Sequence, residues 1–312
     1  MKIKKPFFWS SKNLISIIFL PLSLIVILIT SFKRKFIKKI NFNIPIICVG
    51  NIYLGGTGKT PLALLLAREL TNFKVKPVII RKHYKQHEDE ILMIKNQFND
   101  LITDNNRIKA LKIAEKNASD LVILDDGFQD IKIKKDLNII CFNQKQLVGN
   151  GYVLPAGPLR ESLNSLSDAN ILIINGKKEE KFEKKVLRIN KELDIFYSKY
   201  VPQNLKDFEN KQLIALAGIG NPNNFFDLLS QYNLKVVKKL IFPDHYQFDQ
   251  KQILSIADEA SKNNLQIIMT EKDYFKVKKY SLNNRFQFLK VNLEIENKDK
   301  LIKKILSTYE NF

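Results

Sequence analysis

The sequence predicts an α/β protein with a mostly parallel sheet, a second and smaller α/β domain, and an N-terminal helix that associates with membranes. Three observations support this architecture. Short apolar runs alternate with segments of helical periodicity, a glycine-rich loop follows the first of these runs, and an uncharged apolar segment lies near the N-terminus. With 312 residues, the chain is long enough for about two domains.

The N-terminal segment 14–30 carries no charge and is almost wholly apolar. As a helix it would extend over roughly 25 Å, less than the hydrocarbon core of a bilayer, which is about 30 Å thick. Basic residues flank it on both sides, which favours the cytoplasm for both ends. Pro21 introduces a kink, and no small-residue cleavage site follows. We therefore favour a helix anchored at the cytoplasmic face over a full span, a signal peptide or a buried core helix.

The expected strands and helices form two α/β regions. In the first, the strands are 44–49, 75–80, 121–124, 137–142 and 169–174, and the helices include 62–70 and 107–117. A lysine- and glutamate-rich stretch at 177–191 predicts an exposed helix, and the weak pattern over 197–210 indicates a linker. In the second region, the strands are 213–217 and 265–269, and the helices are 223–230 and 250–262.

The motif GGTGKTP at 55–61 predicts a phosphate-binding loop (P-loop), because it connects an expected strand to a leucine-rich helix. Glycines let the backbone approach a phosphate closely, so that successive N–H groups bind its oxygens at the helix N-terminus. Lys59 is expected to reach the β- and γ-phosphates, and Thr60 to hold Mg²⁺. The full pattern has glycine where this chain has Tyr53. The expected nucleotide-binding residues are Gly55, Gly56, Thr57, Gly58, Lys59 and Thr60.

Acidic residues follow two of the expected strands. Asp125 and Asp126 follow the strand at 121–124, where a P-loop protein places the carboxylate that organises Mg²⁺, and Asp125 is the first choice. The run EDE at 88–90 is expected at the same edge of the sheet. A solvated strand end and a charged loop are the competing interpretations. His245, in the loop FPDHYQF, is able to orient a general base if it faces a carboxylate such as Asp89.

The chain has 51 Lys and Arg residues against 32 Asp and Glu residues, a formal net charge of +19. This excess indicates anionic partners such as an anionic membrane surface or a phosphorylated substrate, although a solvated lysine-rich surface would account for part of it. The basic residues are scattered and are not interleaved with aromatic ones, so we expect no nucleic-acid partner. Both cysteines lie in apolar runs, which predicts core packing in a reducing compartment.

Seven motifs are shared, in order and with similar spacing, with one known family. They are VGNIYLGGTGKTP (49–61), DE (89–90), LDDGFQ (124–129), GNGYVLPAGPLRE (149–161), AGIGNP (217–222), FPDH (242–245) and TEKD (270–273). Together they cover most of residues 1–275. On these motifs the chain resembles the tetraacyldisaccharide 4′-kinases, which are the lipid A 4′-kinases of Gram-negative bacteria, and that family also lacks the glycine at the position of Tyr53.

The resemblance implies transfer of the γ-phosphoryl group of ATP, with Mg²⁺, to the 4′-hydroxyl of an acylated glucosamine disaccharide 1-phosphate. It implies that Asp89 is the catalytic aspartate, that His245 is its dyad partner, and that Lys59 contributes to catalysis. The residues expected around the metal are Thr60, Glu90, Asp125 and Asp126, and those expected to contact the substrate are Gln129 and Arg160.

We expect three parts: a membrane-anchoring helix with basic flanks at 1–40, a P-loop kinase core at 41–200, and a C-terminal α/β domain at 201–312 that closes over the active site. The expected state is a monomer at the cytoplasmic face of the inner membrane of a Gram-negative bacterium. A membrane-docked P-loop ATPase switch is the alternative, but it does not account for PAGPLRE or FPDH.

Three features depart from the family pattern. The segment RKHYK at 81–85 contains no glycine, where the family has an Arg-Gly-Tyr-Gly segment, which leaves the role of Tyr84 open. Asp130 stands where the family has a histidine, and it adds a negative charge near the expected metal site. The tail beyond residue 283 carries no matching motif.

Overall fold

The computed structural model describes residues 6–84, 88–280 and 285–312. The chain forms two compact units. The large unit consists of Lys5–His83, Phe98–Lys199 and Leu293–Phe312, and the small unit contains Tyr84–Gln97 and Tyr200–Asn292. Each unit is therefore assembled from segments that are distant in the sequence.

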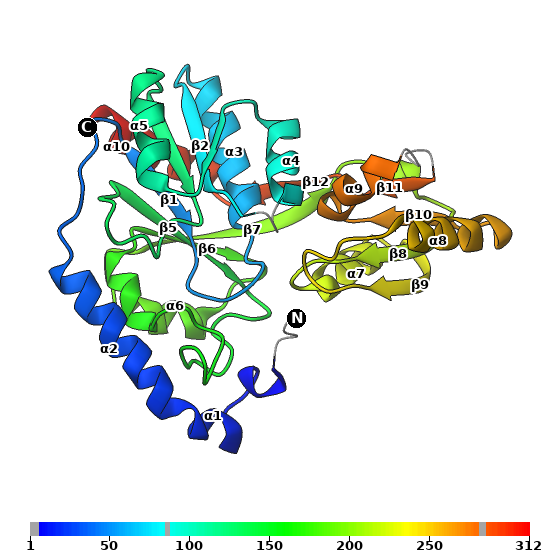
Figure 1. Cartoon of the computed structure of the whole chain (residues 1–312), viewed down its shortest axis with the longest axis horizontal. Helices are drawn as coiled ribbons and strands as arrows, with labels where there is room; N and C mark the ends of the chain where they lie inside the picture. Colours follow the sequence, from blue (N-terminus) through cyan, green and yellow to red (C-terminus); the bar gives the residue numbers. More distant parts are fainter. Residues whose placement is uncertain (1–5, 85–87, 281–284) are drawn as a thin grey trace. The chain divides into compact units, whose positions relative to one another are not determined.

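An eight-stranded sheet organises the large unit (Figure 1). Its strands are β1 (Ile46–Gly50), β2 (Pro77–Lys82), β3 (Leu101–Asp104), β4 (Leu121–Asp125), β5 (Leu137–Asn143), β6 (Ile171–Asn175), β7 (Asp194–Pro202) and β12 (Val291–Ile295). Their spatial order is β12-β7-β6-β5-β1-β4-β2-β3, and the neighbours from β7 to β3 run parallel. β1 and β4 are buried along their whole length, which is why they appear in the sequence as continuous apolar runs.

The helices of the large unit pack on this sheet through apolar side chains. α5 (Arg107–Lys116) and α6 (Glu180–Leu187) cover the face to which Ile46 and Cys48 of β1 point. α3 (Lys59–Asn72) follows the loop after β1 and contacts β1, β2, β4 and α10 (Lys298–Glu310). Both cysteines are buried and free, and burial raises the pKa of Cys48 to about 11 and that of Cys141 to about 12, so neither is a reactive thiolate.

The N-terminal apolar segment forms two helices, α1 (Leu14–Ile18) and α2 (Leu20–Phe36), instead of one. The break falls at Phe19, and Pro21 occupies the first turn of α2, where its missing N–H has no helical partner to lose. Among the described residues, no helix combines the length and the apolar character needed to cross a bilayer.

α2 is the long blue helix of the large unit (Figure 1). One side of α2 contacts the rest of this unit, and the opposite side is exposed and apolar. The buried hydroxyl of Ser23 donates to the carbonyl of Val153 at 2.7 Å and accepts from the N–H of Ala156 at 3.0 Å. Both partners lie in the motif GNGYVLPAGPLRE, so this motif holds the helix. The more-than-half-exposed apolar side chains of α1 and α2 include Leu14, Ile18, Leu24, Leu28 and Phe32.

The small unit is built around a four-stranded parallel sheet. Its strands are β8 (Gln212–Ala217), β9 (Lys235–Ile241), β10 (Gln266–Met269) and β11 (Phe286–Phe288), in the order β11-β10-β8-β9. Alternate residues of β8 point to opposite faces, which are covered by α7 (Pro222–Gln231) and α8 (Gln250–Lys262). α4 (Glu88–Gln97) packs against α9 (Glu271–Val277).

Two expectations about secondary structure are wrong. The segment 197–210 is not a linker throughout, because β7 continues to Pro202. The segment 177–191 contains α6, but Phe182 and Val186 of this helix are buried rather than exposed. In addition, β9 was not among the expected strands. It lies at a sheet edge, and its alternate side chains, two of them lysines, face solvent.

Candidate active site

The glycine-rich loop of the large unit has the backbone that phosphate binding requires. Gly58 is the N-cap of α3 and adopts a φ of 92°, and Gly55 has a φ of 130°, both of which are accessible to glycine and strained for other residues. The side chain of Asn51 ties the loop together by donating to the carbonyl of Gly55 and, at 2.9 Å, to the hydroxyl of Thr57. A Cβ on Gly56 would meet no atom within 4 Å, so this part of the loop faces open space.

Lys59 lies in the first turn of α3, and its Nζ is 3.6 Å from Oδ1 of Asp126. Arg160 donates to the same carboxylate oxygen at 2.8 Å. Burial raises the pKa of Asp126, but the charges of Lys59 and Arg160 outweigh it and hold this pKa well below its ordinary value. Burial also lowers the pKa of the Lys59 ammonium, and Asp126 opposes that shift. Asp126 is thus an ionised carboxylate between two cations.

Asp125 ends β4 with its side chain fully buried, next to Thr60. The hydroxyl of Thr60 is 3.1 Å from Oδ2 of Asp125, and the guanidinium of Arg81 donates to both groups. The other carboxylate oxygen, Oδ1, has no hydrogen-bond partner among the described residues. A buried carboxylate oxygen without a partner, beside a P-loop hydroxyl, is a donor set that fits Mg²⁺.

The charge that Asp130 adds to this region is balanced by a buried arginine. Arg107, in the first turn of α5, forms an ion pair with Asp130 and donates to the backbone carbonyls of Asp125 and Asp126. Arg107 therefore fixes the segment LDDGFQ and compensates the departure from the family pattern. Gln129 donates to the carbonyl of Asn51 at 2.8 Å, which joins this segment to the P-loop.

The small unit contains the second group of expected site residues. Asp89 lies in the first turn of α4, is 3% exposed, and its Oδ1 is 3.2 Å from Nδ1 of His245. His245 adopts a φ of 56°, which is rare for a residue other than glycine and places its ring in the cluster around Asp89. The structure therefore brings these two residues together within one unit, although 156 positions separate them in the sequence.

Lys272 of α9 connects the carboxylates around His245. Its Nζ is 2.7 Å from Glu90, 3.0 Å from Asp244 and 3.9 Å from Oδ2 of Asp89. Burial raises the pKa of Asp89, but the hydrogen bond from His245 and the positive charges of the nearby lysines outweigh it, so this pKa is lower than usual. Asp89 is consequently ionised at neutral pH and able to accept a proton.

The expected site residues thus form two groups, one in each unit. Lys59, Thr60, Asp125, Asp126, Gln129, Arg160 and the residues 55–58 belong to the large unit, and Asp89, Glu90 and His245 belong to the small unit. Glu90, expected near the metal, is bound by Lys272 in this structure. Neither unit, in its described part, holds three or more His, Cys, Asp or Glu side chains grouped as a metal site.

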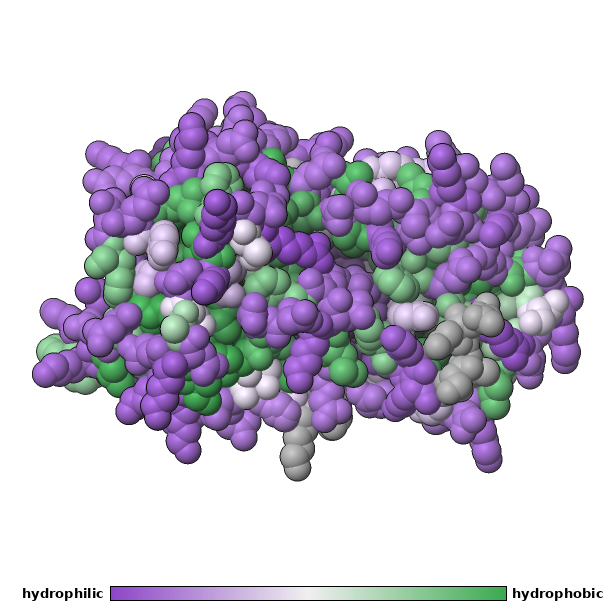
Figure 2. Space-filling view, turned by 90° about the horizontal axis from the view of Figure 1, so that it is seen from above, coloured by the Kyte–Doolittle hydropathy of each residue, from purple (hydrophilic) through white to green (hydrophobic). Residues whose placement is uncertain are grey.

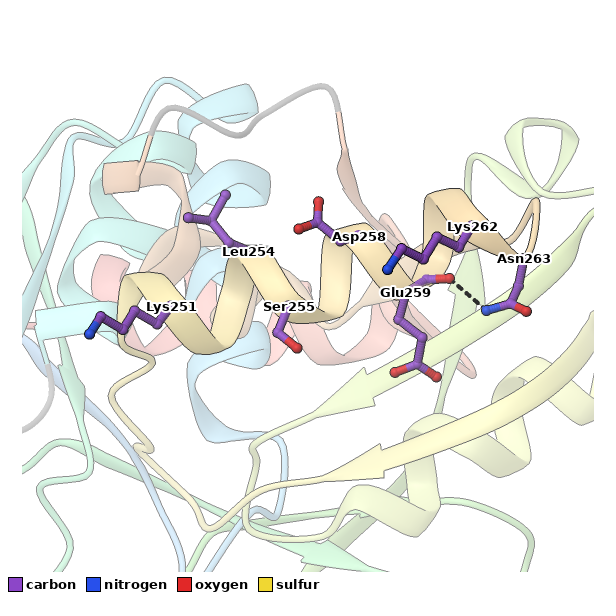
Figure 3. A pocket seen from close by; sticks show the side chains of 7 residues that line it. All are labelled: Lys251, Leu254, Ser255, Asp258, Glu259, Lys262 and Asn263. Carbon is purple, nitrogen blue, oxygen red and sulfur yellow. Dashed lines mark hydrogen bonds between the residues drawn. The ribbon is translucent and has the colours of Figure 1, made fainter.

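Four charged residues that contact these groups were not among the expected site residues: Arg81, Arg107, Lys272 and Lys276, whose Nζ is 3.4 Å from Oδ2 of Asp89. Arg81 is the last but one residue of the buried strand β2, and this position is a usable signal, since the carboxyl ends of parallel strands carry ligand contacts. Lys272 belongs to the motif TEKD, to which the resemblance assigns no role. A pocket on the small unit lies elsewhere, along α8, and is lined by surface residues such as Leu254, Asp258 and Asn263 (Figure 3).

Comparisons with known proteins decide the family. A family model described as tetraacyldisaccharide-1-P 4′-kinase matches residues 15–310. The tetraacyldisaccharide 4′-kinase of Pelagibacter ubique is 42% identical over 79% of this chain and 80% of its own length. That of Rickettsia canadensis is 32% identical over 79% of each chain. This chain belongs to the tetraacyldisaccharide 4′-kinase family.

The fold of this kinase family member agrees with a solved structure. The crystal structure of LpxK from Aquifex aeolicus, described as an apo form in complex with ATP, superimposes with a TM-score of 0.74 at 23% identity and covers 95% of this chain and all of its own. The predicted α/β class with a mostly parallel sheet is confirmed, and so is the predicted kinase family. The motifs shared with this family contain all the expected site residues of the two groups described above.

Proposed function

We propose that this kinase transfers the γ-phosphoryl group of ATP to the 4′-hydroxyl of tetraacyldisaccharide 1-phosphate and releases ADP and the 1,4′-bisphosphorylated lipid. The observation that carries the proposal is the buried, ionised Asp89 held by His245, in a chain whose large unit also has a P-loop with its lysine and threonine in place. The P-loop alone would fit many NTPases, whereas a buried aspartate–histidine pair suits activation of an alcohol.

The large unit supplies the nucleotide site in this proposal. Gly55, Gly56, Thr57, Gly58 and Thr60 would bind the ATP phosphates, mainly through backbone N–H groups at the N-terminus of α3. Lys59 would leave Asp126 for the γ-phosphate, whose negative charge replaces that of the carboxylate. Mg²⁺, when bound, supplies charge neutralisation of the phosphates, and Thr60 and Asp125 would hold it, with Asp126 beside them. Glu90 stays a candidate for this role through the family resemblance alone.

The small unit supplies the acceptor step. Asp89 would accept the proton of the 4′-hydroxyl while the oxygen forms its bond to the γ-phosphorus and the bond to the β,γ-bridging oxygen breaks. A carboxylate with a lowered pKa is a weak base. This is sufficient because phosphoryl transfer has a loose transition state in which positioning matters more than early proton removal.

The lipid substrate gives the remaining features a role. Arg160 and Gln129, whose side chains lie 3.2 Å apart, would contact the substrate beside the P-loop. The exposed apolar side of α1 and α2 would bind the anionic inner membrane surface on the cytoplasmic side, together with Lys33 and Lys35 in the last turn of α2 and Lys38 and Lys39 beyond it. Figure 2 shows one face of the molecule, on which hydrophilic side chains predominate, as the high charge requires. We further propose that the protein acts as a monomer.

The test is a phosphoryl-transfer assay with purified protein in detergent, ATP, Mg²⁺ and tetraacyldisaccharide 1-phosphate. We expect formation of the bisphosphorylated lipid and its loss in Asp89→Asn. Glu88→Gln is the matched control, because Glu88 is an exposed carboxylate in the same helical turn, and it should keep full activity. No lipid product, with equal ATP hydrolysis in the presence and absence of lipid, would instead indicate an ATPase switch.

A further inference from the structure

An ion pair that the proposed reaction does not use lies next to the pair formed by Asp89 and His245. Lys276 and Asp273 are both on α9, their side chains are 1% and 0% exposed, and Nζ of Lys276 is 2.7 Å from Oδ1 of Asp273. Burying two opposite charges costs desolvation free energy, and replacement of such a pair by apolar residues is often neutral or stabilising. Stability alone therefore gives no reason for an ion pair at this position.

Backbone groups from another strand end hold this pair in place. Gly218, which follows β8 in the motif AGIGNP, donates its N–H to Oδ2 of Asp273 at 2.7 Å and accepts from Lys276 at 3.3 Å. The hydroxyl of Thr270 donates to Oδ2 of Asp273 at 2.7 Å. A Cβ at position 218 would stand 2.8 Å from Oδ1 of Asp273, so a larger residue there would displace this carboxylate. The motifs AGIGNP and TEKD thus meet at one buried pair.

Of the two charges in this pair, the ammonium of Lys276 lies next to Asp89. Nζ of Lys276 is 3.4 Å from Oδ2 of Asp89, whereas His245 contacts the other oxygen, Oδ1. Oδ2 is buried and accepts no hydrogen bond from any described residue. Lys272 is slightly further away, at 3.9 Å, and shares its charge with Glu90 and Asp244.

We propose that Lys276, held by Asp273, is the positioning residue of Asp89: its ammonium fixes the orientation of the carboxylate through Oδ2. This proposal rests on the proposed function of Asp89. The two neighbours act on different oxygens of the carboxylate, His245 on Oδ1 and Lys276 on Oδ2.

The charged groups around Asp89 come from three elements. α4 contributes Glu90, the loop after β9 contributes Asp244 and His245, and α9 contributes Lys272 and the Asp273–Lys276 pair. Removal of the Lys276 side chain takes away the nearest cation at Oδ2, so the carboxylate of Asp89 loses one of the two contacts that fix its orientation.

The experiment measures kcat, and the KM values for ATP and for tetraacyldisaccharide 1-phosphate, in Lys276→Met. We expect kcat to fall by about 10-fold or more with both KM values unchanged, because the variant binds its substrates and only the accepting carboxylate is misplaced. Lys276→Arg keeps the charge and should restore kcat at least in part. Val277→Ala is the control for a purely structural effect, because Val277 is buried in the same helix among apolar side chains; it should lower the melting temperature and leave kcat unchanged.

A second variant covers the case in which Lys276→Met does not fold because Asp273 is left buried without its cation. Asp273→Asn/Lys276→Met removes both charges and keeps an amide oxygen for Gly218 and Thr270. A wild-type kcat in this folded double variant would overturn the proposal, and a lower kcat with unchanged KM values supports it. Failure of the proposed function itself is seen separately, as absence of lipid product from the wild-type protein.

Discussion

Arg81 and Asp125 are direct neighbours in the register of β2 and β4, and the guanidinium of Arg81 donates to Asp125 and to the hydroxyl of Thr60. The arginine therefore contacts both side chains that we assign to Mg²⁺. A cation of the protein and a metal ion would compete for Oδ2 of Asp125, while Oδ1 has no partner among the described residues. This contact offsets the desolvation cost of burying the charged carboxylate of Asp125 at the end of β4.

Replacing Arg81 by methionine should strongly destabilise the large unit. Loss of one partner from a buried ion pair typically costs about 3–5 kcal/mol, because the remaining charge is left without compensation. Mg²⁺ should partly replace the missing cation, so millimolar Mg²⁺ should raise the melting temperature of Arg81→Met more than that of the wild-type protein. Calorimetry with and without EDTA measures this difference; equal responses in both proteins would contradict the assignment of Asp125 to the metal.

Lys59→Ala should reduce turnover more than His245→Ala. Lys59 is expected to stabilise charge on the transferred phosphoryl group, and removal of one such preorganised group costs roughly 10²–10³ in kcat or more. His245 acts through Asp89, which Lys272 and Lys276 continue to hold, so its loss should cost no more than about 10². Single-turnover kinetics with saturating ATP compare the two variants, and an equal loss would reject the ranking.

The stability contributed by Asp126 should disappear at low pH. Its pKa is lowered by Lys59 and Arg160, so its contribution is fully present above the ordinary carboxyl pKa of 3.8 and is lost as pH falls through the lower folded-state value. The difference in melting temperature between the wild-type protein and Asp126→Asn should therefore be constant from pH 5 to 7 and shrink below about pH 4. Glu310→Gln, at an exposed helix end, is the control and should show no such trend.

Charges on the exposed side of α2 should abolish the proposed membrane binding and leave the fold intact. Leu24 and Leu28 are 57% and 69% exposed, so Leu24→Glu/Leu28→Glu removes little packing. Burial of one leucine contributes roughly 1.5–3 kcal/mol, so the double change should weaken binding by at least about 100-fold. Cosedimentation with vesicles of anionic lipid measures this. Ile113→Glu, on the exposed side of α5, is the matched control; if it weakens binding equally, the effect is one of charge and α2 is not the docking element.

Local patterns were sufficient to predict the buried parts of the fold. β1 and β4 are continuous apolar runs that end in glycine and aspartate. The predicted roles of the P-loop and of Asp125 follow from their positions at the carboxyl ends of these strands. The approach of Asp89 to His245 could not be derived from the residues alone, because 156 positions separate the two and α4 is held in the small unit by its packing against α9. The residues raised this pair only as a condition, and the family resemblance named it. Edge strands such as β9 and cations such as Arg107 were missed, because their partners are set by tertiary contacts rather than by spacing.

The path of the chain through the eight-stranded sheet has a consequence for biosynthesis. β7 and β12 are neighbours in this sheet, and the N–H of Glu296 donates to the carbonyl of Tyr197, although about 90 residues of the small unit are synthesised between them. During translation, the P-loop strand and its neighbours are complete long before β12 and α10 emerge from the ribosome. Until then β7 is an open edge able to pair with other chains, so a ribosome stalled within the small unit should yield a nascent chain that depends on chaperones to stay soluble.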